Sequence, residues 1–288
     1  MIQWPDDLVS AIARRRSVIF LGAGVSMNSV NAAGLKPPSW KAFLINGIAR
    51  CTGSHTEMNR LLKNGDYLSC CQILKYKLAL DWVPFVEEQF LNPRFQANDL
   101  HRAIFALDSS IVLTPNFDKL FDSYASAQGQ NLLKIKVYYD EDIPRVLRGG
   151  GNQRLILKIH GCIDTPDKLI FTREDYANIR NRNANFYRAI DALIFTHTFL
   201  FIGCGMNDPD LALVLEQYAR SFSAAPPHYV LLGGKITAEY ERMMANNSNL
   251  KILKYSVANE HRELLDSVND LGALVEAERA KLVASALW

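Results

Sequence analysis

Short apolar runs recur along the chain and alternate with segments of helical periodicity. Each run has strand length, and several are rich in Ile, Val or Phe, which are common in β-strands. The runs are residues 17–21 (SVIFL), 110–114 (SIVLT), 155–160 (LILKIH), 199–203 (FLFIG), 228–232 (HYVLL) and 250–255 (LKILKY). Such alternation predicts an α/β fold, with a parallel sheet covered by helices on both faces.

Two stretches of the chain depart from this alternation. The interval of about 40–106 shows helical patterns and no strand pattern. This interval fits either helices packed against the sheet or a helical insert above a ligand site. The long connection between the predicted strands at 17–21 and 110–114 favours the insert. A C-terminal helix is expected at about 260–287, with self-association as an alternative to simple packing; its apolar face comprises Leu264, Val268, Leu271 and Val275.

Composition narrows the class of protein. Apolar residues make up 49 % and charged residues 22 %, which is typical of a globular enzyme. The net charge of +2 gives no argument for direct nucleic-acid binding. The 5 cysteines lack the spacing of a disulfide framework or a zinc site. The N-terminus has no secretory pattern, and the most apolar segment, 192–206, is too short to span a membrane, so we expect a cytoplasmic protein.

Polar or glycine-rich motifs follow four of the predicted strands, at the edge where parallel sheets bind ligands. The first is GAGVS (22–26), which suits either a plain tight turn or a phosphate cradle; the full dinucleotide fingerprint fails because residue 27 is Met. The second is TPNFD (114–118). Asn116 and Asp118 are ordinary turn and cap residues after a strand, but the amide also suits a ribose hydroxyl or a water.

The third and fourth motifs follow the strands at 155–160 and 199–203. His160 precedes Gly161, and a histidine in this place is either structural or a general base. The fourth motif is GCGMNDPDL (203–211), in which Asp208 either caps a helix beginning near Pro209 or binds a ligand hydroxyl. His197 has no motif around it and is interpreted as a packed or capping residue.

Together and in this order, over about residues 17–211, the four motifs resemble those of the sirtuin family. Sirtuins carry a GAG-x-S loop, a T-x-N-x-D motif, a catalytic histidine followed by glycine, and a later glycine loop at the NAD adenosine. The segment FTREDY (171–176) is similar to one in prokaryotic sirtuin-like proteins. The resemblance implies a single NAD-binding domain over 1–288, with a Rossmann-like parallel sheet.

The chain departs from the protein deacylases of that family. The segment NAAGLKPPSW (31–40) stands where deacylases carry G-I-P-D-F-R, and no zinc ribbon with four cysteines is expected. The helical stretch at 40–106 is similar to that of sirtuin-like proteins of bacterial antiviral defence, which hydrolyse NAD. The resemblance therefore implies an NAD glycohydrolase that releases nicotinamide and ADP-ribose. An NAD-dependent deacylase and a non-enzymatic module sensing NAD or ADP-ribose are the alternatives.

The resemblance also implies roles for individual residues. Asn116 and His160 are the catalytic residues, with Asn116 holding the nicotinamide ribose and the water, and His160 acting as base. NAD is bound as the substrate, no metal is expected, and the binding residues are Gly22, Ala23, Gly24, Ser26, Thr114, Asp118, Gly203, Gly205, Asn207 and Asp208. Short effectors of this kind imply a homo-oligomer and a HerA-family hexameric ATPase as partner.

Overall fold

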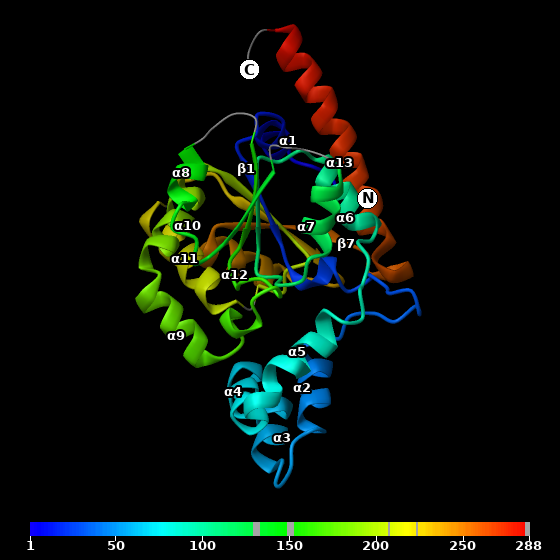
Figure 1. The fold of residues 1–288 in the computed structure, drawn as a ribbon. Helices are drawn as coiled ribbons and strands as arrows, with labels where there is room; N and C mark the ends of the chain where they lie inside the picture. The colour runs from blue at the N-terminus through cyan, green and yellow to red at the C-terminus, as the bar shows by residue number, and fades with distance from the viewer. Residues whose placement is uncertain (129–132, 149–152, 207, 223, 286–288) are drawn as a thin grey trace.

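The six apolar runs form strands of one parallel sheet, and a seventh strand joins it at an edge (Figure 1). The structure is a computed structural model that describes residues 1–128, 133–148, 153–206, 208–222 and 224–285. The order is β3-β4-β2-β1-β5-β6-β7, all parallel. The bounds are β1 Ser17–Leu21, β2 Ile111–Thr114, β3 Leu133–Val137, β4 Arg154–Lys158, β5 Thr198–Ile202, β6 His228–Gly233 and β7 Leu250–Tyr255. The predicted α/β fold is confirmed.

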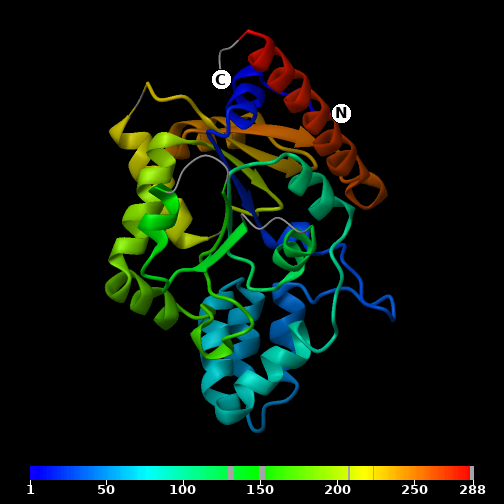
Figure 2. The same ribbon diagram turned by 45° about the horizontal axis from the view of Figure 1, so that its top comes forward.

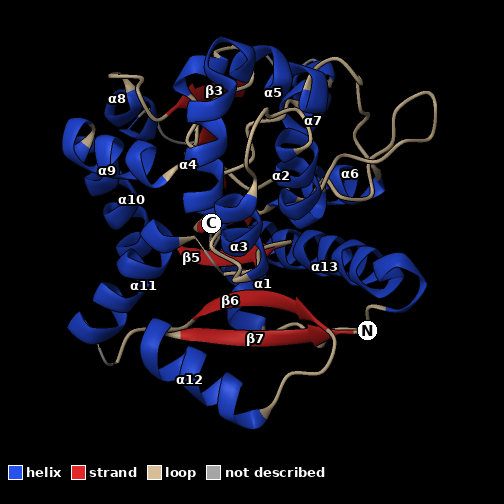
Figure 3. Ribbon diagram, turned by 90° about the horizontal axis from the view of Figure 1, so that it is seen from below, coloured by secondary structure: helices blue, strands red, loops and turns tan. Residues whose placement is uncertain are grey.

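Helices cover both faces of the sheet, which explains why its central strands are mostly apolar on both faces. Every residue of β1 is buried, with Ile19 and Leu21 in one core and Val18 and Phe20 in the other. The first core includes α1 (Asp6–Ala13), α6 (Asp99–Ala106), α7 (Leu120–Ala127) and α13 (Ala258–Ala284). The second includes α8 (Ile143–Arg148), α10 (Ala184–Thr196), α11 (Pro209–Ser221) and α12 (Ala238–Ser248). Seen from below, β6 and β7 lie side by side (Figure 3).

The strand that the sequence did not predict is β3. Its residues LKIKV alternate apolar and basic at the edge of the sheet, where Lys134 and Ile135 are exposed and the half-buried Lys136 pairs with Asp142 at 2.7 Å. Lysine is common on edge strands because its charge opposes pairing with other chains. Because lysines interrupt its apolar residues, β3 lacks the apolar run from which the other strands are predicted.

A second body of helices lies beyond the sheet (Figures 1 and 2). It comprises α2 (Trp40–Ile48), α3 (Thr56–Lys63), α4 (Tyr67–Leu78) and α5 (Trp82–Phe90). These helices share their own core, in which Phe43 stacks on Trp40, Phe85 and Phe171. Phe171 precedes α9 (Arg173–Arg182), so the core joins these helices to the chain that follows β4. By contrast, α6 packs with the sheet.

The C-terminal helix α13 packs along its predicted face, since Leu264, Val268, Leu271 and Val275 are all buried. Its first residues, 259–261, are left-handed, so regular helix begins after them. The face prediction is confirmed, and the division of the chain into one domain with a helical insert stays a prediction.

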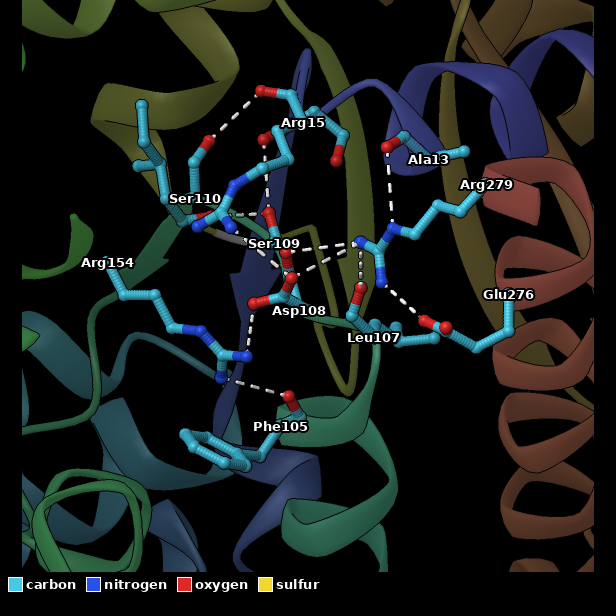
Figure 4. Close-up of polar contacts among 12 residues, drawn as sticks. Ala13, Arg15, Phe105, Leu107, Asp108, Ser109, Ser110, Arg154, Glu276 and Arg279 are labelled. Atoms are coloured by element: carbon cyan, nitrogen blue, oxygen red, sulfur yellow. Dashed lines mark hydrogen bonds and ion pairs between the residues drawn. The ribbon is translucent and has the colours of Figure 1, made fainter. Parts of the chain in front are cut away.

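An ion cluster ties elements together at the amino edge of the sheet (Figure 4). Asp108 pairs with Arg15 (3.3 Å), with Arg154 and, at 3.7 Å, with Arg279 of α13. The arginines also donate to backbone carbonyls: Arg279 to Leu107 (3.0 Å) and Arg154 to Phe105 (3.3 Å). Because these carbonyls lie at the end of α6, the cluster neutralises a helix C-terminus as well as a carboxylate.

Candidate active site

A cleft opens at the carboxyl edge of the sheet, between the sheet and the second body of helices. Its volume is about 1860 Å³, larger than the usual range for small-molecule sites. It spans the point between β1 and β5 where the strand order reverses, which is where open α/β sheets bind ligands. Predicted site residues that line it are Gly22, Ala23, Gly24, Ser26, Asn116, Asp118, His160, Gly203, Gly205 and Asp208. Asn207 lies outside the described residues.

The two glycine loops form the floor of the cleft by packing against each other. The Gly22 amide donates to the Ile202 carbonyl (2.8 Å), and the Gly24 amide donates to the Gly203 carbonyl (2.9 Å). A Cβ on Gly22 would lie 2.4 Å from that carbonyl oxygen, so only glycine fits there. Both amides are engaged by the protein, and their contact with a diphosphate stays a prediction.

The second motif is fastened to the first through Thr114 and Asn116. The buried Thr114 hydroxyl donates to the Leu21 carbonyl (2.7 Å) and accepts from the Asn116 amide (3.0 Å). The Asn116 side-chain nitrogen donates to the Gly22 carbonyl (3.0 Å). Because a carbonyl only accepts, this bond fixes the amide orientation and leaves Oδ1 as the acceptor at the cleft. Thr114 therefore holds the loop from beneath, since it is not among the residues that line the cleft.

Asp118 connects both loops to α7. One carboxylate oxygen accepts from the Leu120 amide (3.0 Å), and the other accepts from the Ser26 hydroxyl (3.0 Å). The N-cap position of α7 is Lys119, so Asp118 satisfies the first amide of the helix from one residue earlier than a regular cap. His101, which no sequence motif singles out, has its Nε2 3.5 Å from the Ser26 hydroxyl. Burial lowers the pKa of His101 to about 4, against an opposing effect of the Asp122 charge, so the ring is neutral at pH 7.

Lys158 is a second residue that sequence reasoning missed. It is the polar residue within the buried run of β4, and it is fully buried. Its ammonium donates to the Asp118 carbonyl and pairs with the buried Asp122 at 2.8 Å. Burial raises the pKa of Asp122, while the Lys158 charge opposes that rise. A lysine inside an otherwise apolar strand was the available signal, because such a residue must find a buried partner.

His160 meets two partners that come from distant parts of the chain. Its Nε2 lies 3.1 Å from Asp208 Oδ2 and 3.2 Å from the Tyr176 hydroxyl. That hydroxyl donates to Asp208 Oδ2 (2.9 Å), and the Leu211 amide donates to Asp208 Oδ1 (2.9 Å). The last bond caps α11, so the capping interpretation of Asp208 is confirmed.

The carboxyl of Asp208 is held ionised. Burial alone raises its pKa, but the hydrogen bond and charge of His160, with the Leu211 and Tyr176 hydrogen bonds, lower the pKa to about 2. Asp208 is thus a permanent acceptor at neutral pH.

His197 takes no part in these contacts. It is the C-cap residue of α10, just before β5, as the capping interpretation predicted.

The described part of the chain holds neither a cluster of metal ligands nor a membrane-spanning helix. Among these residues, no three or more His, Cys, Asp or Glu side chains group as metal ligands. In the same ranges, no helix combines the length and the apolar character that crossing a bilayer requires.

Comparison with known proteins supports the resemblance. Residues 110–253, half of the 288-residue chain, match the family model of the SIR2-like domain. The chain is 26 % identical over 222 residues to defense-associated sirtuin 2 of Bacillus subtilis, covering 75 % of this chain and 20 % of the relative. It is 25 % identical over 182 residues to NAD(+) hydrolase ThsA of Acinetobacter baumannii, covering 61 % and 37 %. For NAD(+) hydrolase ThsA of Cytobacillus dafuensis, the identity is 24 % over 212 residues, covering 73 % and 40 %.

The chain therefore spans less than half the length of these relatives. On the match over half of its length, this chain belongs to the SIR2-like domain family.

Proposed function

We propose that this chain is an NAD glycohydrolase that cleaves NAD to nicotinamide and ADP-ribose, and that it depletes NAD in antiviral defence. The observation that carries the proposal is the convergence of Asn116, His160 and two glycine loops on one cleft at the β1/β5 switch point. The relatives' names, NAD(+) hydrolase and defense-associated sirtuin, support the same activity and setting.

The reaction needs little covalent help from the protein. The bond between the nicotinamide nitrogen and the ribose C1′ breaks, and its electron pair neutralises the cationic ring, which leaves as nicotinamide. The ribose passes through a state like an oxocarbenium ion, as in glycoside hydrolysis. A water oxygen then bonds to C1′ and loses a proton to a base. The enzyme must therefore hold the ribose, place one water and accept one proton.

The geometry of Asn116 and His160 suits these tasks. The Asn116 amide is oriented by the Gly22 carbonyl, so its Oδ1 accepts a hydrogen bond from the ribose or the water. His160 lines the same cleft and is the base, a role that typically contributes about 10²- to 10⁴-fold to rate. Ser26, Asp118 and Thr114 keep the first two loops in register through the bonds described above. Gly203 and Gly205 bring the fourth loop against the adenosine side.

Assembly and location belong to the same proposal. We take from the resemblance a cytoplasmic homo-oligomer that works with a HerA-family hexameric ATPase. A freely active NAD hydrolase would harm its host, so control by assembly or by a partner is expected. Light scattering of the purified chain, alone and with such an ATPase, measures both associations.

The test is nicotinamide release from NAD by the purified chain without peptide, alone and with a HerA-family ATPase. We expect equal amounts of nicotinamide and ADP-ribose, and loss of both in His160→Ala and Asn116→Ala. Asn178→Ala is the matched control, because Asn178 is exposed on α9 and does not line the cleft. Cleavage of NAD only when an acetyl-lysine peptide is added, with acetyl transfer, would overturn the proposal in favour of a deacylase.

A further inference from the structure

The contacts of His160 give Asp208 a role other than the NAD binding that the resemblance assigns, and they add Tyr176, which the resemblance does not assign. We propose that Asp208 and Tyr176 are positioning residues, which hold the His160 ring with Nε2 protonated so that Nδ1 is the base in the cleft. This inference rests on the proposed function for its catalytic meaning, but the tautomer it specifies is a property of the chain alone.

The first argument is the direction of the hydrogen bonds. An ionised carboxylate only accepts, so Asp208 Oδ2 requires a donor at His160 Nε2, 3.1 Å away. The Tyr176 hydroxyl donates to the same oxygen at 2.9 Å, which leaves its own oxygen facing Nε2–H at 3.2 Å. In a neutral ring, a proton on Nε2 means a lone pair on Nδ1. Among the described residues, Nδ1 has no hydrogen-bond partner.

The second argument is that both partners are themselves fixed. Asp208 Oδ1 caps α11 through the Leu211 amide, so the carboxylate cannot rotate without losing the cap. Tyr176 is buried beside Ile170 and Ile179, and its ring meets the His160 ring edge to face, with centroids 5.2 Å apart. A base held on two sides by such residues is pre-organised for proton transfer.

The third argument concerns where these residues come from. Tyr176 lies on α9, whose start is capped by Thr172 and Asp175. Asp175 also pairs with Lys75 of α4 at 3.0 Å. The second body of helices therefore helps to fix the position of Tyr176, and α11 helps to fix the position of Asp208. This explains why the FTREDY segment and the GCGMNDPD loop occur together with His160 in one chain.

The substitution Asp208→Asn separates positioning from folding. Asparagine is as good an N-cap as aspartate, so its oxygen keeps the bond to the Leu211 amide. Its NH₂ group then faces Nε2 and donates to it, which forces the proton onto Nδ1. The variant should fold normally and carry the wrong tautomer. The same carboxylate-to-amide change in a serine protease triad lowers kcat about 10⁴-fold for this reason.

The experiment combines side-chain ¹⁵N NMR of histidine-labelled full-length chain at pH 8.5 with NAD hydrolysis, and the His160→Ala spectrum identifies the His160 signals. We expect the Nε2–H form in the natural chain and the Nδ1–H form in Asp208→Asn. We expect kcat to fall about 10²- to 10⁴-fold in Asp208→Asn, with KM nearly unchanged. Tyr176→Phe should lower kcat about 10-fold, the equivalent of one hydrogen bond. Tyr138→Phe is the control, because the Tyr138 hydroxyl donates to the Lys168 carbonyl and bonds to neither His160 nor Asp208.

Each outcome decides the inference. An Nδ1–H ring in the natural chain overturns it, whether or not the chain hydrolyses NAD. An unchanged kcat in Asp208→Asn, in a chain that does hydrolyse NAD, also overturns it. If the natural chain releases no nicotinamide with or without partner, the proposed function fails separately. In that case the NMR measurement alone tests the inference: it shows whether Asp208→Asn moves the proton of the His160 ring from Nε2 to Nδ1.

Discussion

At the amino edge of the sheet, Asp108 meets three arginines, whereas at the carboxyl edge Asp208 meets His160 and Tyr176 beside a cleft. Both carboxylates follow a secondary-structure element and both accept several hydrogen bonds. The partners differ in what they can do. Arginine stays protonated and binds helix-end carbonyls, while histidine exchanges a proton near neutral pH.

The difference separates stability from chemistry within one sheet. The amino edge joins α1, α6, β4 and α13 through arginine side chains that pair with Asp108 and donate to backbone carbonyls. The carboxyl edge gathers loops whose side chains retain an acceptor toward the cleft, such as Asn116 Oδ1. Substitution of Asp108 should therefore lower stability, and substitution of His160 should lower activity. The predictions below are ordered by the size of the expected effect.

The largest effect on stability is expected for Lys158→Met, beneath the carboxyl edge. Removing the lysine leaves the buried Asp122 charge without its partner, which typically costs about 3–5 kcal/mol. The loss should shrink at lower pH, because burial raises the pKa of Asp122 and protonation removes the charge. Urea unfolding measures it, with Lys254→Met, an exposed pair with Glu241, as the control. A loss below about 1 kcal/mol would contradict the buried-pair account.

Acid should destabilise both edges through buried histidines. Burial lowers the pKa of His101 and of His228 to about 4, and the His228 Nδ1 accepts from the Phe199 amide. The unfolded chain takes up these protons below about pH 6.5, so stability is full above that pH and is lost toward pH 4. The expected loss at pH 5 is about 2 kcal/mol for each ring.

Unfolding measured at pH 7 and pH 5 tests this loss. His228→Asn keeps an acceptor for the Phe199 amide and removes the titrating ring, so it should halve the acid loss. An equal acid loss in the natural chain and in His228→Asn would show that the titrating groups lie elsewhere.

A smaller loss is expected for Asp108→Asn at the amino edge. Asparagine tolerates the left-handed backbone of this position (φ 53°), so the change removes charge without backbone strain. The partly exposed cluster should lose about 1–3 kcal/mol. Thermal unfolding measures the loss, and Asp99→Asn, in an exposed pair with Arg102, should change stability by less than about 0.5 kcal/mol. No difference between these two variants would mean that the cluster does not stabilise the fold.

The sequence was sufficient for the elements whose apolar pattern is strong. Six strands were found because each carries a run of apolar residues, and the face of α13 was found from its helical spacing. The edge strand β3 was missed because Lys134 and Lys136 interrupt its pattern. The other edge strand, β7, was found although Lys251 and Lys254 interrupt it, because Ile252 and Leu253 are adjacent and leave an apolar run between the lysines.

The site was partly predictable for a similar reason. His160, Asn116 and the glycine loops stand at strand ends, so topology alone brings them together. Tyr176 comes from a helix, and Lys158 and His101 are buried beneath the loops. Their contacts depend on how helices pack onto the sheet, which spacing along one chain does not specify. Thr114 was assigned to binding, yet its hydroxyl supports the loop from below.

The most direct test of the account compares nicotinamide release by three proteins: the natural chain, His160→Ala and Asp108→Asn, at a temperature where all are folded. We predict that Asp108→Asn matches the natural chain, while His160→Ala is at least about 100-fold slower with an unchanged Tm. Release by His160→Ala at the natural rate would contradict the assignment of the chemistry to the carboxyl edge.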